Sequence, residues 1–332
     1  MWETYTVPTD APQPGNEKMQ ALAKATWGNT NNVPITGGGT WTSYTLDPER
    51  GLLYIPVGNP GPDFTSDVRA GQNLYTNAIL ILDAKTGIYR HHYAVVPADF
   101  HDWDLAAAPV LVTTKGGKRI VAAAPKDGML YAYDLTTDKK LYETAITTRE
   151  NVEKPLSTTA THFCPGATGG SEWNGPAYSP DTNLLYDGTV DWCVTVILDP
   201  SELAKKPGQS WTGAQLTDQF GKKDLNWSGW VTATEAETGH VTWRFHATAP
   251  VVSGITPTRG GLVFAGDMDK HAYAFDADSG KILWQTQLPG APGGGVISYL
   301  VDGRQRVAFV AGTRTNVLPV SPASAKIAIF GL

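Results

Sequence analysis

Several features that would point to particular functions are scarce or missing in this chain. Only two of its 332 residues are cysteines and seven are histidines, and neither CxxCH nor HExxH occurs, so the sequence predicts no covalently attached haem and no zinc site. Clusters of Lys and Arg are also missing, and the formal net charge of −6 argues against nucleic acid or an anionic membrane surface as a partner. No run of about 18 apolar residues occurs, so no membrane-spanning helix is predicted.

The residues that are abundant favour a mostly β protein. Glycine (35), proline (23), tyrosine (13) and tryptophan (11) suit many short strands joined by tight turns and packed through aromatic rings. With 41% apolar residues, the chain can bury a sizeable core. Two segments, NEKMQALAKAT at 16–26 and SELAKK at 201–206, are predicted to form short helices.

A repeated phrase divides much of the chain. AFDADSGKILW ends at Trp284 and ATEAETGHVTW ends at Trp243, 41 residues earlier (284 − 243), which is the length of one four-stranded propeller blade. Weaker copies are ILDAKTGIYRHH at 81–92 and AYDLTTDKKLY at 132–142. Each copy reads as a strand, an acidic residue that caps a turn, a Gly free to adopt positive φ, and a second strand ending in a large aromatic. We expect that aromatic side chain to dock between neighbouring blades.

The repeat predicts an all-β fold, a β-propeller of four-stranded antiparallel blades that forms a single domain over 1–332. A hairpin repeat of this kind is unstable alone and must stack on its neighbours. The opening residues Met1-Trp2-Glu3-Thr4 read like the end of a repeat phrase, and only about five blades can be counted. Because a propeller closes on itself to remove its sheet edges, we expect this one to be partial and truncated at its N-terminus.

Several motifs in a fixed order resemble one known family, the PQQ-dependent quinoprotein alcohol dehydrogenases, from about Trp2 to the end of the chain. Besides the repeat phrase, the motifs that carry this resemblance are GGGTWTSYTLDPERGLLYIPVGNPGPDF, ADFHDWDLAAAPVL, CPGATGGSEWNGPAYSPDTNLLY…DWC and GGLVFAGDMDKHAYAFDADSGKILW. Members of that family are eight-bladed periplasmic propellers that oxidise alcohols or related hydroxyl compounds with pyrroloquinoline quinone (PQQ) and a metal ion. The resemblance implies that this chain supplies roughly the last five blades.

The resemblance assigns roles to the carboxylates of Asp102-Trp103-Asp104. A gapless comparison puts Asp102 at the position of the catalytic base, which takes the hydroxyl proton, and Asp104 at the extra carboxylate of lanthanide-using members. Side chains alternate along a strand, so both carboxylates would share one face if this segment were a strand. A shifted comparison puts Asp104 in the catalytic role and Ala106 at the second position, which makes a calcium-type site; we prefer the gapless comparison, with Asp102 as the base. Asn59, 18 residues after Trp41 (59 − 41), matches an amide ligand of the metal.

The resemblance also implies the residues that hold the cofactor. Trp41 matches the tryptophan whose ring forms the floor under the quinone, since stacked flat rings bury much area. Lys126 matches a Lys or Arg that reaches the quinone oxygens and stabilises negative charge there. Glu172, Trp173 and Asn174 cover the segment where many relatives contact the cofactor, although Glu172 replaces the usual Asn.

The two cysteines, Cys164 and Cys193, lie 29 residues apart (193 − 164) near turn signals. Their number permits one disulfide or two buried thiols. The resemblance favours the disulfide, because the two positions match a bonded pair of the family. It also implies a periplasmic location, although the first residues, MWETYTVPTDAPQPGNE, show neither the basic nor the apolar region of a secretory signal.

The function implied by the resemblance is PQQ- and metal-dependent oxidation of an alcohol by hydride transfer to the quinone. The metal would be Ca²⁺ or a lanthanide ion, and the electrons would pass to a separate acceptor such as a cytochrome c or a quinone. As an isolated fragment, the chain is expected to bind PQQ weakly or not at all, because a further glutamate ligand of the family lies before the matched region. The alternative is a non-catalytic propeller similar to the scaffold lipoproteins of outer-membrane protein assembly.

Overall fold

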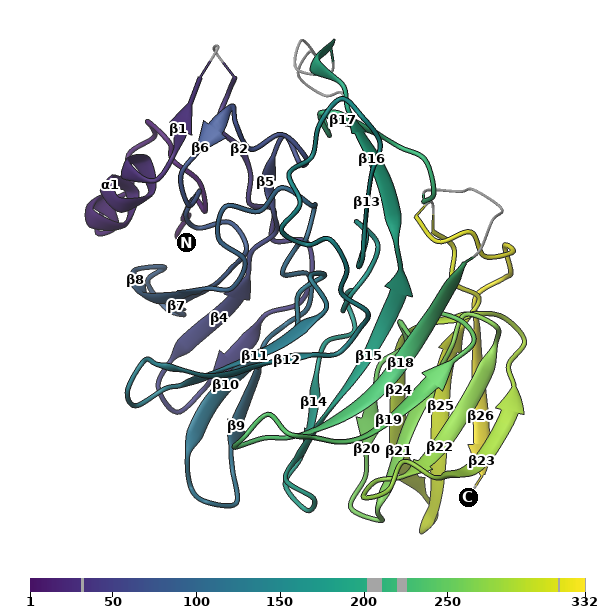
Figure 1. Ribbon diagram of the computed structural model, residues 1–332. Helices are drawn as coiled ribbons and strands as arrows, with labels where there is room; N and C mark the ends of the chain where they lie inside the picture. The colour runs from purple at the N-terminus through teal and green to yellow at the C-terminus, as the bar shows by residue number, and fades with distance from the viewer. Residues whose placement is uncertain (31–32, 202–210, 220–225, 316, 332) are drawn as a thin grey trace.

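A computed structural model describes residues 1–30, 33–201, 211–219, 226–315 and 317–331 (Figure 1). Over these residues five antiparallel sheets follow one another in chain order as blades, four with four strands and the last with three. This confirms the prediction of an all-β propeller with about five blades. The predicted helix at 16–26 is also confirmed, as α1 (Glu17–Ala25). All of the SELAKK segment except Ser201 lies outside the described residues.

The strands of each blade are hydrogen-bonded in the order in which they occur along the chain. The first blade contains β3 (Thr45–Asp47), β4 (Leu52–Pro56), β7 (Ala78–Asp83) and β8 (Tyr89–Ala94). The second contains β9 (Val110–Thr113), β10 (Arg119–Ala123), β11 (Met129–Asp134) and β12 (Lys140–Ala145). The third contains β14 (Ala177–Ser179), β15 (Leu184–Trp192), β18 (Trp227–Glu235) and β19 (Val241–Ala247).

The fourth and fifth blades complete the array. The fourth contains β20 (Thr256–Pro257), β21 (Leu262–Gly266), β22 (His271–Asp276) and β23 (Ile282–Gln287). The fifth contains β24 (Pro292–Val301), β25 (Arg304–Ala311) and β26 (Lys326–Gly331).

Smaller sheets form within the long connections. They pair β1 (Gly28–Asn29) with β6 (Arg69–Ala70), β2 (Thr36–Gly37) with β5 (Pro60–Gly61), and β16 (Val194–Leu198) with both β13 (Thr161–Phe163) and β17 (Ala214–Leu216). Across the described residues, no helix is both long enough and apolar enough to cross a membrane.

The repeat phrase supplies an aromatic side chain that packs against the neighbouring blade. An aromatic ring of one blade packs over the turn glycine of the next, and each of these glycines has φ between 70° and 75°. A Cβ atom added to any of them would lie 2.4–2.5 Å from the ring, which is far inside van der Waals contact. The pairs are Trp2 on Gly87, Tyr142 on Gly239, and Trp243 on Gly280. The prediction that the aromatic of the phrase docks between blades is confirmed for these three pairs.

Apolar clusters fill the space between successive blades. Between the first two blades, Tyr54 and Ile81 meet Val121 and Tyr133. Between the third and fourth, Tyr186 and Val231 meet Phe275, and similar clusters join the second blade to the third and the fourth to the fifth. Most of the stabilising burial therefore lies between sheets, as expected for a stacked array.

The two ends of the array differ in how their outer faces are covered. The helix α1 packs Met19 and Ala23 against Leu80 and Leu82 of the first blade. The outer face of the fifth blade instead exposes a patch of large apolar side chains in the described structure, with exposed fractions of 59% for Ile297, 69% for Ile327 and 57% for Ile329.

Candidate active site

Three loops from the first and second blades meet at the carboxylate of Asp104. Asp104 lies between β8 and β9, and is 7% exposed. One of its oxygens accepts a hydrogen bond from the backbone N–H of Asn59 at 2.8 Å, in the loop after β4. The other is 2.8 Å from Nζ of Lys126, in the loop between β10 and β11. The structure thus brings three residues of the predicted site into direct contact.

The approach of Asp104 to Asn59 depends on Gly58. A Cβ at Gly58 would lie 2.3 Å from Oδ1 of Asp104, so any larger residue would displace that carboxylate. The Gly58 N–H also donates to the carbonyl of Gly39, which ties this loop to the segment that carries Trp41. Glycine is required here by close approach rather than by positive φ.

Trp41 lies next to this contact and presents a free aromatic face. Its side chain is 51% exposed, and Nζ of Lys126 lies 5.9 Å from the centroid of its ring, within the range of a cation–π interaction. An exposed tryptophan ring beside a buried charge pair offers a flat surface on which another planar group can stack.

Asp102 lies in the same loop as Asp104, with a different environment. Its φ is +64°, and residues 102–104 form no strand, so the expectation of two carboxylates on one strand face is wrong. Within the described part of the chain its carboxylate makes no hydrogen bond. Burial raises the pKa of Asp102 well above its ordinary value; Lys126 offsets part of this rise, and the neighbouring carboxylates of Asp63, Asp104 and Asp99 add to it.

The charge of Lys126 is held in place by the surrounding acids. Burial by itself lowers the pKa of this ammonium group, but Asp104, Glu172 and Asp102 together raise the pKa well above its ordinary value. Lys126 is therefore a fixed cation at neutral pH. A second acid, Asp63, accepts a hydrogen bond from the Asn59 side-chain amide at 2.9 Å, and burial together with Asp104 and Asp99 raises its pKa to about 6.

Glu172 lies in the loop between β13 and β14 that faces Lys126. It is 3% exposed, and its Oε1 atom is buried without a hydrogen-bond partner. Burial and Asp104 raise the pKa of Glu172 to about 7, while Lys126 acts in the opposite direction. Side-chain oxygens of Thr168, Ser171 and Asn174 in the same loop are likewise buried without partners. Buried polar atoms in proteins nearly all have partners, so this loop has unused capacity for polar contacts.

The other two residues predicted to contact the cofactor make contacts within the protein. The indole N–H of Trp173 donates to the carbonyl of Gly293 in the fifth blade at 2.8 Å. The amide of Asn174 donates to the carbonyls of Gly188 and Val251 at 2.9 and 3.2 Å. Both residues also line a cavity of about 450 Å³ next to β3 and β9. These bonds join the loop of Glu172 to the third and fifth blades.

Cys164 and Cys193 form the disulfide that the sequence predicted. With His162 they are also the one set of His, Cys, Asp or Glu residues in the described structure whose possible ligand atoms lie within 4.8 Å of one another. Because both sulfurs are bonded to each other, this set has no thiolate to offer a metal. The carboxylates around Asp104 are spaced more widely than this, so they do not form a compact cage by themselves.

Comparison with known proteins places this geometry in a family. Residues 9–153 match the family described as "Glucose/ethanol/alcohol dehydrogenase, beta-propeller domain", and residues 228–326 match the family described as "Outer membrane protein assembly factor BamB". The quinohemoprotein alcohol dehydrogenase ADH-IIG of Pseudomonas putida is 29% identical over 94% of this chain and 48% of its own length. Its solved structure matches with a TM-score of 0.80 at 26% identity, covering 94% of this chain and 50% of that structure.

Residues 9–153 thus match the PQQ-dependent alcohol dehydrogenases, and the relatives that align over 94% of this chain include quinohemoprotein alcohol dehydrogenases. Two methanol dehydrogenases support the same assignment. Subunit 1 of the Paracoccus denitrificans enzyme is 30% identical over 91% of this chain and 51% of its own length. The structure of a europium-containing methanol dehydrogenase matches with a TM-score of 0.73 at 29% identity, covering 83% of this chain and 51% of that one. The chain spans about half the length of the curated relatives it matches.

The residues present fit the quinone and cation of this family. Carboxylate and amide oxygens are the donors that calcium-like cations prefer, and Asp104 and Asn59, which carry such groups, are in contact through the Asn59 backbone. The exposed ring of Trp41, the fixed charge of Lys126, and the unpartnered Glu172 oxygen suit a planar molecule that carries polar oxygens. All of these residues except Glu172 lie within 9–153, the part that matches the dehydrogenase family.

Sequence reasoning missed Asp63, Arg69 and Asp99. Asp63 was visible in the motif GNPGPDF, four residues after Asn59, and its hydrogen bond to Asn59 gives it a place beside the site. Arg69 and Asp99 carry no local signal, because their contacts join segments that are about 30 residues apart.

Proposed function

We propose that this chain carries part of the active site of a PQQ- and cation-dependent alcohol dehydrogenase, with Asp104 as the base. The observation that carries this proposal is the simultaneous contact of Asp104 with Lys126 and with the backbone of Asn59, beside the exposed ring of Trp41. When bound, PQQ would accept a hydride from the alcohol carbon. The carboxylate of Asp104 would take the hydroxyl proton of the alcohol at the same time.

Each neighbour of Asp104 has a role in this proposal. Trp41 supplies the surface under the quinone, and Lys126 supplies a fixed positive charge where negative charge develops. Asn59, Asp104 and Asp63 lie where they could contribute oxygen ligands to the cation. With Asp104 as the base, Ala106 occupies the position two residues later, so a calcium-type site is favoured over a lanthanide site.

The competing assignment makes Asp102 the base and Asp104 the extra metal ligand. The raised pKa of Asp102 favours a role as base, because a general base works best with a pKa near the working pH. We favour Asp104 because it contacts both Lys126 and Asn59, whereas Asp102 makes no hydrogen bond in the described structure.

Titration calorimetry with PQQ in the presence of Ca²⁺ or La³⁺ tests cofactor binding by the 332-residue chain. Trp41→Ala is expected to weaken binding at least tenfold, and Ser43→Ala, on the same loop, is the control.

Dye reduction with primary alcohols then distinguishes the roles of Asp102 and Asp104. Asp104→Asn is expected to bind PQQ and to lose turnover, whereas Asp102→Asn keeps at least a tenth of it. The reverse result would make Asp102 the base, and PQQ binding that does not depend on Trp41 would contradict the proposal for this chain.

The electrons and the location follow from the same proposal. With two cysteines and no CxxCH sequence, the chain carries no covalent haem, so reducing equivalents would pass to a separate acceptor such as a cytochrome c. Several relatives carry "cytochrome c" in their names as the acceptor. The Cys164–Cys193 disulfide supports an oxidising compartment, for which the periplasm is the candidate.

A scaffold role is the second candidate, because residues 228–326 match an outer-membrane assembly factor. That match covers β19, most of β18, the fourth blade, and β24 and β25 of the fifth, and it holds none of the residues around Asp104. The repeat phrase that the two proteins share accounts for this match, so the match does not require a shared function. Binding of PQQ that depends on Trp41 would exclude a purely structural role.

A further inference from the structure

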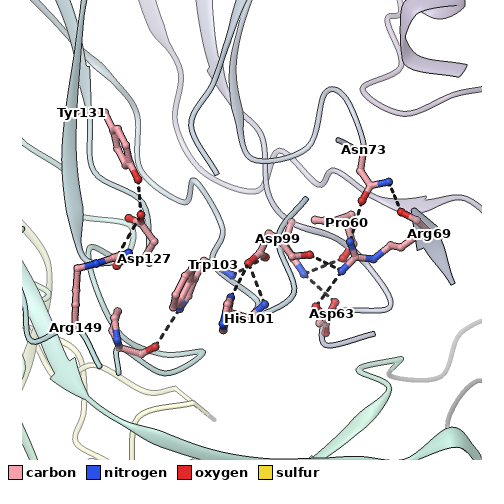
Figure 2. A network of polar contacts seen from close by, with 12 residues as sticks. Pro60, Asp63, Arg69, Asn73, Asp99, His101, Trp103, Asp127, Tyr131 and Arg149 are labelled. Carbon is pink, nitrogen blue, oxygen red and sulfur yellow. Dashed lines mark hydrogen bonds and ion pairs between the residues drawn. The ribbon is translucent and has the colours of Figure 1, made fainter. Parts of the chain in front are cut away.

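A fully buried arginine joins the two loops that carry Asn59 and Asp104. The Arg69 side chain is 0% exposed, and its guanidinium donates to the carbonyls of Pro62 (3.1 Å) and Asp63 (3.2 Å) on the first loop. On the second loop it donates to the carbonyl of Asp99 at 2.6 Å. Figure 2 shows Arg69 reaching toward both segments, with Asn73 beside it. One planar cation therefore sets the separation between the two loops.

Asn73 fixes the orientation of this cation. Its Oδ1 accepts a hydrogen bond from Arg69 at 2.9 Å, and its own amide donates to the Arg69 carbonyl at 2.8 Å. Burial lowers the pKa of Arg69 to about 10, while Asp99 and Asp63 act to raise it, so the guanidinium remains charged at neutral pH. All three guanidinium nitrogens are thus engaged in hydrogen bonds, and the forked geometry leaves little freedom to rotate.

Asp99 holds the turn on which Asp102 lies. Its carboxylate accepts hydrogen bonds from the backbone N–H of His101 at 2.9 Å and of Trp103 at 3.0 Å. Asp102, between these two residues, has φ +64°, a left-handed conformation that is strained for a non-glycine residue. The two bonds span the strained residue and compensate for that strain. The Asp99 side chain thereby orients the backbone that leads into Asp104.

The opposite side of the same turn is packed by aromatic rings. The ring of His101 stacks on Trp103 with centroids 3.8 Å apart and planes 13° apart. The Trp103 indole donates to the carbonyl of Pro165 at 3.1 Å, and the guanidinium of Arg149 lies 5.6 Å from the Trp103 ring. The turn is therefore held between the Arg69 side and the loop that follows the disulfide (Figure 2).

We propose that Arg69 and Asp99 are positioning residues that set the distance between the Asn59 loop and the Asp102–Asp104 turn. Neither residue hydrogen-bonds to Asp104 itself; each acts through the backbone that carries it. This inference rests on the proposed function for its purpose, although the contacts themselves do not require it. If the two loops move apart, the hydrogen bond between the Asn59 N–H and the Asp104 carboxylate is lost.

Backbone amides in both segments report this arrangement without any cofactor. The Asn59 N–H donates to the carboxylate of Asp104, and the N–H groups of His101 and Trp103 donate to the carboxylate of Asp99. Hydrogen exchange of peptides covering 57–64 and 99–106 should accelerate at least tenfold in Asp99→Asn. The milder Arg69→Lys variant, which keeps the charge but loses the fork, should accelerate the same two peptides.

The matched control is Asp267→Asn. Asp267 is also fully buried and also accepts backbone N–H bonds at a turn, those of Asp269 (3.0 Å) and His271 (3.1 Å), but it lies in the fourth blade. This variant should show a comparable loss of thermal stability and unchanged exchange at 57–64 and 99–106. The inference fails if exchange of these peptides in Asp99→Asn and Arg69→Lys matches that in Asp267→Asn.

A second readout uses a metal probe alone. Tb³⁺ luminescence sensitised by tryptophan measures occupation of an oxygen-rich cation site, and Asp99→Asn is expected to weaken Tb³⁺ binding at least tenfold relative to Asp267→Asn. Equal affinities in the two variants would count against positioning. If the unmodified chain binds no Tb³⁺, the proposed cation site fails, and hydrogen exchange still decides the positioning role.

Discussion

At the scale of single residues, buried charges and their partners dominate. Lys126 and Asp104 are each 9% exposed in their side chains and lie 2.8 Å apart. Removing one member of such a pair leaves the other charge buried and uncompensated, whereas removing both restores neutrality. The pair is therefore a direct test of the electrostatics around the site.

For this pair we expect Lys126→Met to lower the free energy of unfolding by about 3 kcal/mol at pH 7. The double variant Lys126→Met/Asp104→Asn should recover at least about 1 kcal/mol of that loss, because neither member of the pair is left charged without its partner. Urea unfolding of the four members of the cycle measures the coupling. Additive losses would show that the two side chains do not stabilise each other.

Asp187, unlike Asp104, is a buried acid without a charged partner. It lies on β15 at 0% exposure, and neither carboxylate oxygen has a partner. Burial raises its pKa from 3.8 to about 7, and Tyr142 on β12 is the ionisable group whose own pKa it raises in turn. The neutral acid is thus the form that folding favours.

The sign of the pH dependence of stability follows from this shift. With a folded pKa above the unfolded value, the stability linked to Asp187 is present below about pH 4 and is lost as pH rises through about 7. The stability of Asp187→Asn relative to the unmodified chain should therefore rise between pH 5 and pH 8.5 by about 3 kcal/mol. Denaturant unfolding at the two pH values measures this, with the exposed Asp181→Asn as control. A difference between variant and parent that does not change with pH would contradict the assignment.

At the scale of elements, the repeat turn joins one blade to the next. Gly280 has φ +70°, and a Cβ there would lie 2.5 Å from the Trp243 ring of the preceding blade. Gly261, in the same blade, has φ +76°, and a Cβ there would meet nothing within 4 Å. The two positions share the backbone strain and differ only in the interblade contact.

We expect Gly261→Ala to cost about 1 kcal/mol, from the left-handed backbone alone. Gly280→Ala should cost about 3 kcal/mol or more, because Trp243 must also leave its packed position. Thermal unfolding of the two variants, together with the near-UV circular dichroism of tryptophan, measures the difference. Equal losses would show that ring packing over the glycine adds nothing to the blade contact.

In the second blade the repeat phrase lacks its glycine, and a different contact joins this blade to the preceding one. Asp138 occupies the turn-glycine position of AYDLTTDKKLY and adopts φ +57°. The preceding blade supplies His91, with Nε2 3.8 Å from the Asp138 carboxylate, and the Tyr93 hydroxyl, which donates to that carboxylate at 2.8 Å. Polar contacts thus replace the ring-on-glycine packing at this interface.

At the scale of the whole molecule, the outer face of the fifth blade is the largest departure from an ordinary soluble surface. Ile297, Ile327 and Ile329 lie on that face and are all more than half exposed. Contiguous apolar patches of this kind are rare on monomeric proteins and promote association.

We therefore expect the isolated chain to scatter more light as its concentration rises. The double variant Ile327→Lys/Ile329→Thr should reduce that scattering at least twofold without a loss of thermal stability, since both side chains are already in water. Leu22→Lys, on the exposed side of α1, is the control. Unchanged scattering in the double variant would show that this face does not drive association.

The sequence alone determined the architecture because the repeat is local. A strand, a turn with its acidic residue and glycine, and a docking aromatic all lie within about a dozen residues, so reading AFDADSGKILW is enough to predict a blade and its contact. The helix at 17–25 and the cysteine pair were also predicted, the latter only through resemblance to a family. Motif order in 9–153 likewise carried the candidate site.

Tertiary structure decided which acid occupies the centre of that site. From sequence, the gapless comparison favoured Asp102 as the base, with Asp104, two residues later, as the alternative. Only the folded loops show that Asp104 contacts Lys126 and Asn59, while Asp102 sits at the strained position of a turn. The conformation of this turn depends on contacts between distant segments. Asp99 and Arg69, the latter from another loop, hold the turn in place, and the sequence of the turn itself does not reveal such contacts.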